Sequence, residues 1–187
     1  MKKLTLPAFA LLCALTSASA LEIQGVAVPQ QVQVSGQTLT LNGAGLRTVT
    51  LLLIPIKAYV AAFYSPTPLR AEADVQTSPG PLQFTFTFLR AVSQSDVAQA
   101  WGTQFADSNT HSYPGFASDL AAFIAMFGPL NQGGVQMVQL VGTDTLVYDK
   151  GQLKGTLPGR DFQKSFLSLW FGSNPVAPAL KAALLGS

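Results

Sequence analysis

The chain has one cysteine, one histidine and few charged residues, and these shortages exclude several classes of protein. Charged residues make up 11% of the 187 residues, against a usual share of about 25% in soluble domains. The 11 Lys and Arg residues nearly balance the 9 Asp and Glu residues, and no basic run occurs. We therefore expect no nucleic-acid partner. Hydrophobic residues make up 48%, which is enough apolar surface for a folded core and excludes intrinsic disorder.

The scarce residue types also exclude the common catalytic and metal sites. His111 is the only histidine and lies in a polar stretch, so we predict that it is a solvated loop residue. A zinc site needs several His, Cys or carboxylate ligands, and we expect no metal site. The sequence contains no G-x-S-x-G nucleophile motif, no P-loop and no G-x-G-x-x-G motif. We therefore expect no cofactor.

The first 20 residues have the pattern of an export signal. Met1–Lys3 is positively charged, Leu4–Leu15 is apolar and includes the only cysteine, and Ala18–Ala20 is a small-x-small cleavage site. We expect a signal peptide over residues 1–20 with cleavage after Ala20, and location in the periplasm. The rest, residues 21–187, would be a single domain without cysteine and with balanced charges. It has no further apolar run of about 18 residues, so we expect no membrane span after signal removal.

The first half of this domain has the sequence pattern of β-strands. Alternating apolar residues predict a hairpin that turns at Ser35–Gly36, and the glycine-rich segment Asn42–Gly45 predicts a break. The apolar segment Thr48–Tyr64 predicts two strands, or one bent strand, because Pro55 interrupts it. Residues 65–81 are rich in proline and predict a loop. Phe84–Phe88 alternates Phe and Thr, which predicts a strand with one buried face.

The second half adds helices and a further hairpin. Ser93 and Asp96 resemble a capping box, and apolar residues then recur at helical spacing. Further helices are predicted over residues 116–127, 162–170 and 177–185, and strands over 135–141, 145–148 and 153–157. Strands followed by helices, a hairpin and more helices are typical of an α+β fold. We predict an antiparallel sheet covered on one face by a layer of helices.

Arg47 is the strongest candidate for a binding residue. It follows the glycine-rich segment and precedes a long apolar region that also contains Lys57 and Tyr59. A cation among apolar side chains needs a partner, because an unpaired buried charge is costly. The partner could be a ligand carboxylate or phenolate held by the guanidinium group. Alternatively, Arg47 lies at a strand end and reaches water or an aspartate. The sequence leaves both readings open.

Two segments resemble the chalcone isomerase superfamily, and in particular its bacterial exported branch. The first segment is Asn42–Thr48 followed by Ile56–Tyr64, and the second is Gly155–Phe162 followed by Leu169–Gly172 and Pro175-Val176. The resemblance covers about residues 35–186. It implies an open-faced β-sandwich, with a large antiparallel sheet, a layer of helices and a ligand cleft between them.

The resemblance also assigns site residues. Plant chalcone isomerases use an arginine to stabilise a phenolate and a set of polar residues to place water at a ketone. Arg47 matches the arginine, but the threonine, tyrosine and asparagine positions fall on Tyr59, Ser93 and Ala100. Because only the arginine is retained, the resemblance argues against flavonoid cyclisation. In the fatty-acid-binding proteins of the superfamily, an arginine and a tyrosine hold a carboxylate, and Arg47 with Tyr59 resembles that pair.

Three functions follow from these observations. The first is non-catalytic binding of a fatty acid or similar amphiphilic carboxylate through Arg47 and Tyr59, with apolar lining from the strand at 84–88 and the helix that carries Val97 and Trp101. The second is an intramolecular lyase or isomerase acting on another substrate, with Tyr59 as general acid. The third is an accessory protein with a protein partner in the periplasm. The oligomeric state stays open.

Overall fold

The computed structural model describes residues 20–108 and 112–187. The predicted signal peptide, apart from Ala20, and the predicted loop residue His111 therefore lie outside the described residues.

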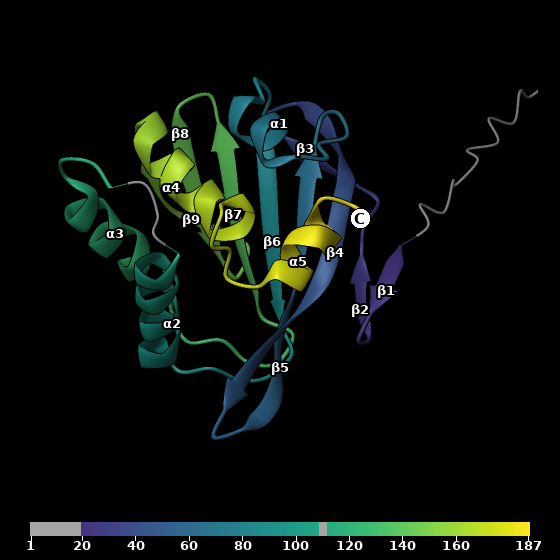
Figure 1. Ribbon diagram of the computed structural model, residues 1–187, viewed down its shortest axis with the longest axis vertical. Coiled ribbons are helices and arrows are strands. Elements are labelled where there is room, and N and C mark those ends of the chain that lie inside the picture. The colour runs from purple at the N-terminus through teal and green to yellow at the C-terminus, as the bar shows by residue number, and fades with distance from the viewer. Residues whose placement is uncertain (1–19, 109–111) are drawn as a thin grey trace, which may run out of the picture.

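Seven strands form one antiparallel sheet whose spatial order follows the chain order (Figure 1). Its strands are β3 (Gln31–Val34), β4 (Gln37–Leu51), β5 (Ile54–Ser65), β6 (Leu82–Phe88), β7 (Val135–Val141), β8 (Asp144–Asp149) and β9 (Gln152–Leu157). A separate hairpin of β1 (Leu21–Ile23) and β2 (Val26–Val28) precedes it. Short turns join β3 to β4, β4 to β5, β7 to β8 and β8 to β9, whereas α1 lies between β5 and β6, and α2 and α3 lie between β6 and β7.

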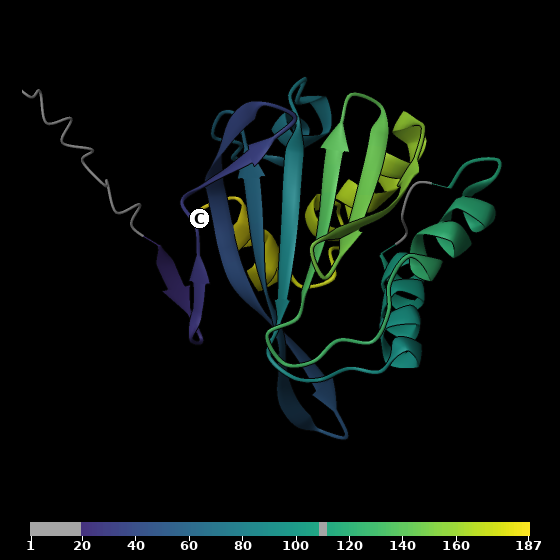
Figure 2. The ribbon, with the colours of Figure 1, turned by 180° about the vertical axis from the view of Figure 1, so that it is seen from behind.

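The described helices gather on one face of this sheet. They are α1 (Glu72–Thr77), α2 (Gln94–Asp107), α3 (Phe116–Ala125), α4 (Arg160–Phe171) and α5 (Pro178–Leu184). In Figure 1, α4 and α5 cross the front of the sheet while α2 and α3 lie to one side. Figure 2 shows the opposite face, which these helices leave open. The predicted α+β class, with an antiparallel sheet and helices on one face, is confirmed.

Aromatic side chains fill the space between the sheet and the helices. Phe84 and Phe86 are buried on the helix side of β6, as the alternation of Phe and Thr predicts. Phe86 stacks on Trp170 of α4 at a ring distance of 5.1 Å and meets Trp101 of α2 edge-on at 5.8 Å. Such contacts add to the free energy gained by burying large apolar rings. They fix α2 and α4 against the strands that carry the candidate site.

The predicted break at Asn42–Gly45 is wrong, because β4 runs through it without interruption. Asn42 lies in a β-bulge, between the pairs Leu41–Tyr64 and Gly43–Phe63. Its Nδ2 donates to the carbonyl oxygens of Leu69 at 2.9 Å and Leu184 at 2.8 Å, and its Oδ1 accepts from the Leu69 amide at 2.7 Å. Asn42 therefore ties β4 to the loop that follows β5 and to α5.

Two further local expectations need correction. The break in the segment 48–64 falls at Leu52-Leu53 rather than at Pro55, which pairs with Thr50 inside the hairpin. Because β5 pairs with β6 only from Tyr59 onward, Pro55 has one neighbouring strand, and proline is tolerated there. The predicted loop over residues 65–81 also contains the short helix α1, whose six residues are too few for a periodic pattern.

Candidate functional site

A cleft of about 610 Å³ lies between α2 and the ends of β4, β5 and β6. Small-molecule sites commonly have volumes of roughly 300–1,000 Å³. The residues that line it come mainly from these strands and from α2. They are Arg47, Val49, Thr50, Ile56, Ala58, Tyr59, Phe86, Phe88, Arg90, Val92, Asp96, Val97, Gln99, Ala100, Trp101, Thr103, Gln104 and Gln136.

Arg47 and Tyr59 face each other across β4 and β5. They are direct cross-strand partners in the register, and a bulge separates this pair from the next pair, Thr48 and Lys57. The Arg47 guanidinium lies close enough to the phenol of Tyr59 to lower its pKa. Its Nη1 also donates to the Thr48 carbonyl oxygen at 2.9 Å. Contrary to the prediction of a glycine turn before it, Arg47 projects from the middle of a strand.

Burial makes ionisation of the Tyr59 phenol more difficult. The side chain is buried, and this burial raises the pKa of the phenol well above its usual value near 10. The interaction with the positively charged Arg47 lowers the pKa of Tyr59, but by less than burial raises it. A tyrosine is already neutral at pH 7, and burial strengthens this preference, so Tyr59 is a neutral hydroxyl that can donate a hydrogen bond beside the Arg47 cation. This combination suits a carboxylate ligand.

The same burial predicts that the protein loses stability in alkaline solution. Burial also raises the pKa of Tyr64 to about 12. Between pH 10 and 12 the folded protein holds protons that the unfolded chain has released, so the free energy of unfolding falls as pH rises. At about 1.4 kcal/mol per pKa unit, Tyr64 alone accounts for a loss of about 3 kcal/mol. Denaturant unfolding at several pH values, with tyrosinate absorbance recorded in parallel, measures this loss.

Tyr59→Phe removes one of the three phenols whose pKa burial raises, the others being those of Tyr64 and Tyr113, so the stability of this variant should fall less steeply with pH than that of the wild type. An equally steep fall in both proteins would contradict the prediction.

Aromatic and aliphatic side chains form the wall next to the Arg47–Tyr59 pair. Phe86 contacts the Tyr59 ring edge-on at 5.5 Å, and Phe88 lies at the same distance on the other side. Val97 and Trp101 on α2 supply the opposite wall. Helix α2 is held in place by its capping box, in which the Asp96 amide donates to Ser93 Oγ at 3.1 Å and the Ser93 amide donates to Asp96 Oδ2 at 3.3 Å.

The cleft also reaches buried amides that sequence reasoning missed. Gln136 on β7 is fully buried, and both atoms of its side-chain amide lack a hydrogen-bond partner in the part of the chain that the structure describes. Gln104 on α2 donates from Nε2 to the Ala100 carbonyl at 2.9 Å, while its Oε1 has no partner among the described residues. Both amides were missed because glutamines are usually exposed. For Gln136 the sequence does carry a signal, since its spacing in the strand puts it on the same face as Val138 and Leu140.

The free energy of unfolding should rise by about 1–2 kcal/mol when Gln136 is replaced by methionine. The substitution removes two buried polar atoms that lack partners and keeps nearly the same shape. Gln139 on the same strand is the matched control, because its Nε2 donates to Gln83 Oε1 at 2.8 Å. Gln139→Met should therefore lower stability by about 1 kcal/mol. Equal changes in both variants in chemical denaturation would contradict this assignment.

The other positions matched to the plant enzymes are not equivalent to catalytic groups. Ser93 is the N-cap of α2 and does not line the cleft, whereas Ala100 lines it with only a methyl group. The structure adds Arg90, a second cation at the cleft, which the sequence analysis did not single out. Of the residues proposed from the sequence, the structure places Arg47 and Tyr59 together beside the predicted apolar residues Val97 and Trp101. Their role in ligand binding stays a prediction.

The described residues offer neither a metal-binding cluster nor a helix that could span a membrane. In residues 20–108 and 112–187, no three His, Cys, Asp or Glu side chains cluster in a way that could hold a metal ion. Within the same ranges, no helix has the length and hydropathy needed to cross a membrane.

Comparisons with known proteins identify the fold and the family of this chain. No curated protein matches the sequence. The crystal structure of a fatty-acid binding protein from Arabidopsis thaliana is similar, with a TM-score of 0.72 and 16% sequence identity. That similarity covers 86% of this chain and 92% of the Arabidopsis chain, and at this identity it shows the fold. A family model described as chalcone isomerase-like matches residues 20–186, and the chain therefore belongs to the chalcone isomerase-like family.

Proposed function

We propose that this protein binds a fatty acid or a similar amphiphilic carboxylate in the cleft without transforming it. The observation that carries the proposal is the cross-strand pair of Arg47 and Tyr59 at one side of an apolar cleft. Arg47 supplies a permanent positive charge with several N–H donors, and Tyr59 supplies a neutral hydroxyl. Together they would hold the two oxygens of a carboxylate.

The remaining cleft residues suit the chain of such a ligand. Phe86, Phe88 and Trp101 present aromatic surface beside the pair, and burial of an alkyl chain against such surface is favourable at about 25 cal/mol per Å². The similar structure from Arabidopsis is titled a fatty-acid binding protein. This title supports the ligand class, and the geometry of the Arg47–Tyr59 pair supports it independently.

The raised pKa of Tyr59 favours binding over catalysis. An efficient general acid has a pKa near the working pH. Burial raises the pKa of the Tyr59 phenol and so moves it further from neutral pH. The position matched to the asparagine of the plant enzymes is Ala100, which can neither donate nor accept a hydrogen bond through its side chain. We further propose, from the N-terminal pattern alone, that the protein is exported to the periplasm.

Trp101 allows a direct test of ligand binding. It lines the cleft, so a fatty acid with bromine atoms on its chain should quench its fluorescence, and unlabelled dodecanoate should reverse the quenching. Trp101→Phe should remove most of the quenching, because the other tryptophan, Trp170, is not among the residues that line the cleft. Native mass spectrometry of the purified protein, followed by organic extraction, would identify any amphiphile already bound. Absence of both quenching and bound amphiphile would overturn the proposal.

A further inference from the structure

The hairpin of β4 and β5 ends in an exposed apolar tip. Figure 1 shows that this hairpin extends beyond the rest of the sheet, at the lower end of the view. At its end, Leu52 is 86% exposed, Leu53 is 94% exposed and Ile54 is 62% exposed. Isolated exposed leucines are ordinary on protein surfaces, but three consecutive large apolar side chains at a projecting tip indicate an interaction site. We call residues 52–54 the apolar tip.

The backbone of the apolar tip is unsuited to the residues that occupy it. Leu52 and Leu53 form a two-residue turn with φ angles of 49° and 66°. Positive φ at both positions is the type I′ geometry, for which Asn-Gly is the preferred sequence. Leucine is disfavoured there, because its Cβ crowds the backbone in the left-handed region. Two leucines in this turn therefore cost stability without contributing to the core, which points to a role outside the fold.

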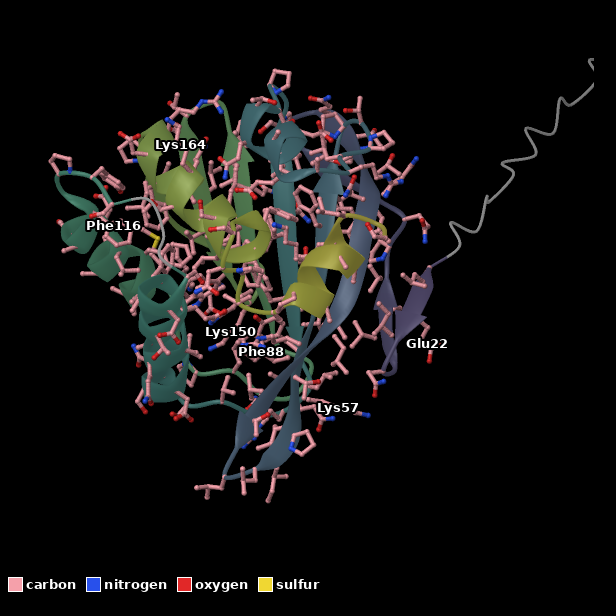
Figure 3. All side chains as sticks on the ribbon, viewed as in Figure 1. Glu22, Lys57, Phe88, Phe116, Lys150 and Lys164 are labelled. Atoms are coloured by element: carbon pink, nitrogen blue, oxygen red, sulfur yellow. The ribbon has the colours of Figure 1, made fainter. Side chains whose placement is uncertain are left out.

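The charges on the hairpin that carries the apolar tip have one sign. The sequence contains no Asp or Glu between Glu22 and Glu72, so the whole hairpin lacks carboxylates. Its cations are Arg47 and Lys57, and Figure 3 shows Lys57 on the side of the hairpin that faces away from α2. Arg90 adds a third cation at the cleft beside the hairpin, and Asp96, whose carboxylate takes part in the α2 cap, is the only carboxylate that lines the cleft. An apolar tip among cations is complementary to an anionic lipid surface.

The apolar tip is also continuous with the mouth of the cleft. Val49, Thr50 and Ile56, which lie next to the tip on the two strands of the hairpin, line the cleft. Val49 is itself an exposed apolar residue. A surface that held the tip would therefore lie against the opening of the cleft.

We propose that the apolar tip inserts into the interfacial region of a bilayer that contains anionic lipids, with the exposed cations Lys57 and Arg90 at the level of the headgroups. A bilayer accepts a narrow convex tip without a preformed socket, whereas a protein partner would need a matching pocket. The proposal does not depend on what the cleft binds, because Leu52 and Leu53 are not among the residues that line it.

The test uses vesicles of phosphatidylethanolamine and phosphatidylglycerol in a 3:1 ratio, with phosphatidylcholine vesicles for comparison. The full chain should co-sediment with the anionic vesicles, and Leu52→Asn/Leu53→Gly should weaken this binding at least tenfold. The same double substitution places the preferred residues in a type I′ turn, so its unfolding temperature should be equal or higher. A merely structural role for the leucines cannot produce loss of vesicle binding together with retained stability. Both proteins keep the same N-terminal segment, so any binding through that segment cancels in the comparison.

A second readout locates the inserted residue. Leu53→Trp should add a fluorescence component that shifts to the blue with anionic vesicles and is quenched by brominated phospholipids. Leu153→Trp is the matched control, because Leu153 is an exposed leucine, 52% accessible, on the edge strand β9. Its fluorescence should not change. Equal vesicle binding by wild type and the double variant, equal binding to the two lipid compositions, or self-association through the tip in place of vesicle binding would each overturn the proposal.

Discussion

Replacement of Gly43 by alanine should lower the free energy of unfolding by about 3 kcal/mol, the upper end of the usual cost of overpacking. A Cβ at this position would collide with the backbone carbonyl oxygen of Ala183 and would lie 2.7 Å from that of Leu184. These oxygens belong to the end of α5 and cannot move as a flexible side chain can. The helix would have to shift away from β4, although Leu180 and Leu184 anchor it in the core.

Gly102→Ala is the matched control for this substitution. Gly102 lies inside α2, and an added Cβ would meet nothing within 4 Å. Alanine is favoured over glycine in a helix by about 1 kcal/mol, so this variant should be more stable than the wild type. In a chain of this size, 1 kcal/mol corresponds to about 2–4 °C in the unfolding temperature. Thermal unfolding followed by circular dichroism therefore separates the two variants, and equal destabilisation by both would contradict the proposed collision.

The contrast between Gly43 and the predicted strands shows which features a sequence can reveal. The alternation in Phe84–Phe88 and the capping pair Ser93 and Asp96 act within a few residues, and both were predicted correctly. The reason for Gly43 lies on α5, about 140 residues further along the chain, as does the Leu184 carbonyl that Asn42 bonds. A glycine-rich segment is usually a turn, and no local pattern distinguishes a turn from a strand that a helix approaches closely.

Some features of the candidate site could likewise be predicted from the sequence, and others could not. The resemblance to the chalcone isomerase superfamily singled out Arg47 and Tyr59, and the structure places them opposite each other. Their alignment depends on the bulge after Arg47, which shifts the register and which spacing along the sequence does not indicate. Gln136 was missed because glutamines are usually exposed, although its spacing of two and four residues from Val138 and Leu140 puts it on their buried face. In the structure it faces the same side as Phe86, its partner on β6.

Binding of dodecanoate should be about 10- to 100-fold weaker in Arg47→Ala than in the wild type. A hydrogen bond to a charged group contributes about 1.5–3 kcal/mol, and each 1.4 kcal/mol changes the dissociation constant about tenfold. The loss should depend on the ligand's charge, because Arg47 would contact the head group and the aromatic wall would contact the chain. Methyl dodecanoate, which has the same chain without the negative charge, should lose little affinity. Isothermal titration calorimetry or displacement of the brominated fatty acid from Trp101 measures both ligands.

Lys57→Ala is the control that distinguishes a direct contact between Arg47 and the ligand from a general effect of positive charge on the hairpin. Lys57 lies on the same hairpin, but it is exposed and its Nζ donates to Gln24 Oε1 at 2.7 Å, away from the cleft. Its removal should leave dodecanoate binding within about twofold of wild type, because exposed charges are well screened by water and salt. Arg47→Lys should fall between the two, since lysine keeps the charge but lacks the planar set of donors. Equal losses in Arg47→Ala and Lys57→Ala would mean that the ligand senses only the overall charge. Equal losses for dodecanoate and its methyl ester would mean that Arg47 acts on the shape of the cleft and not on a carboxylate.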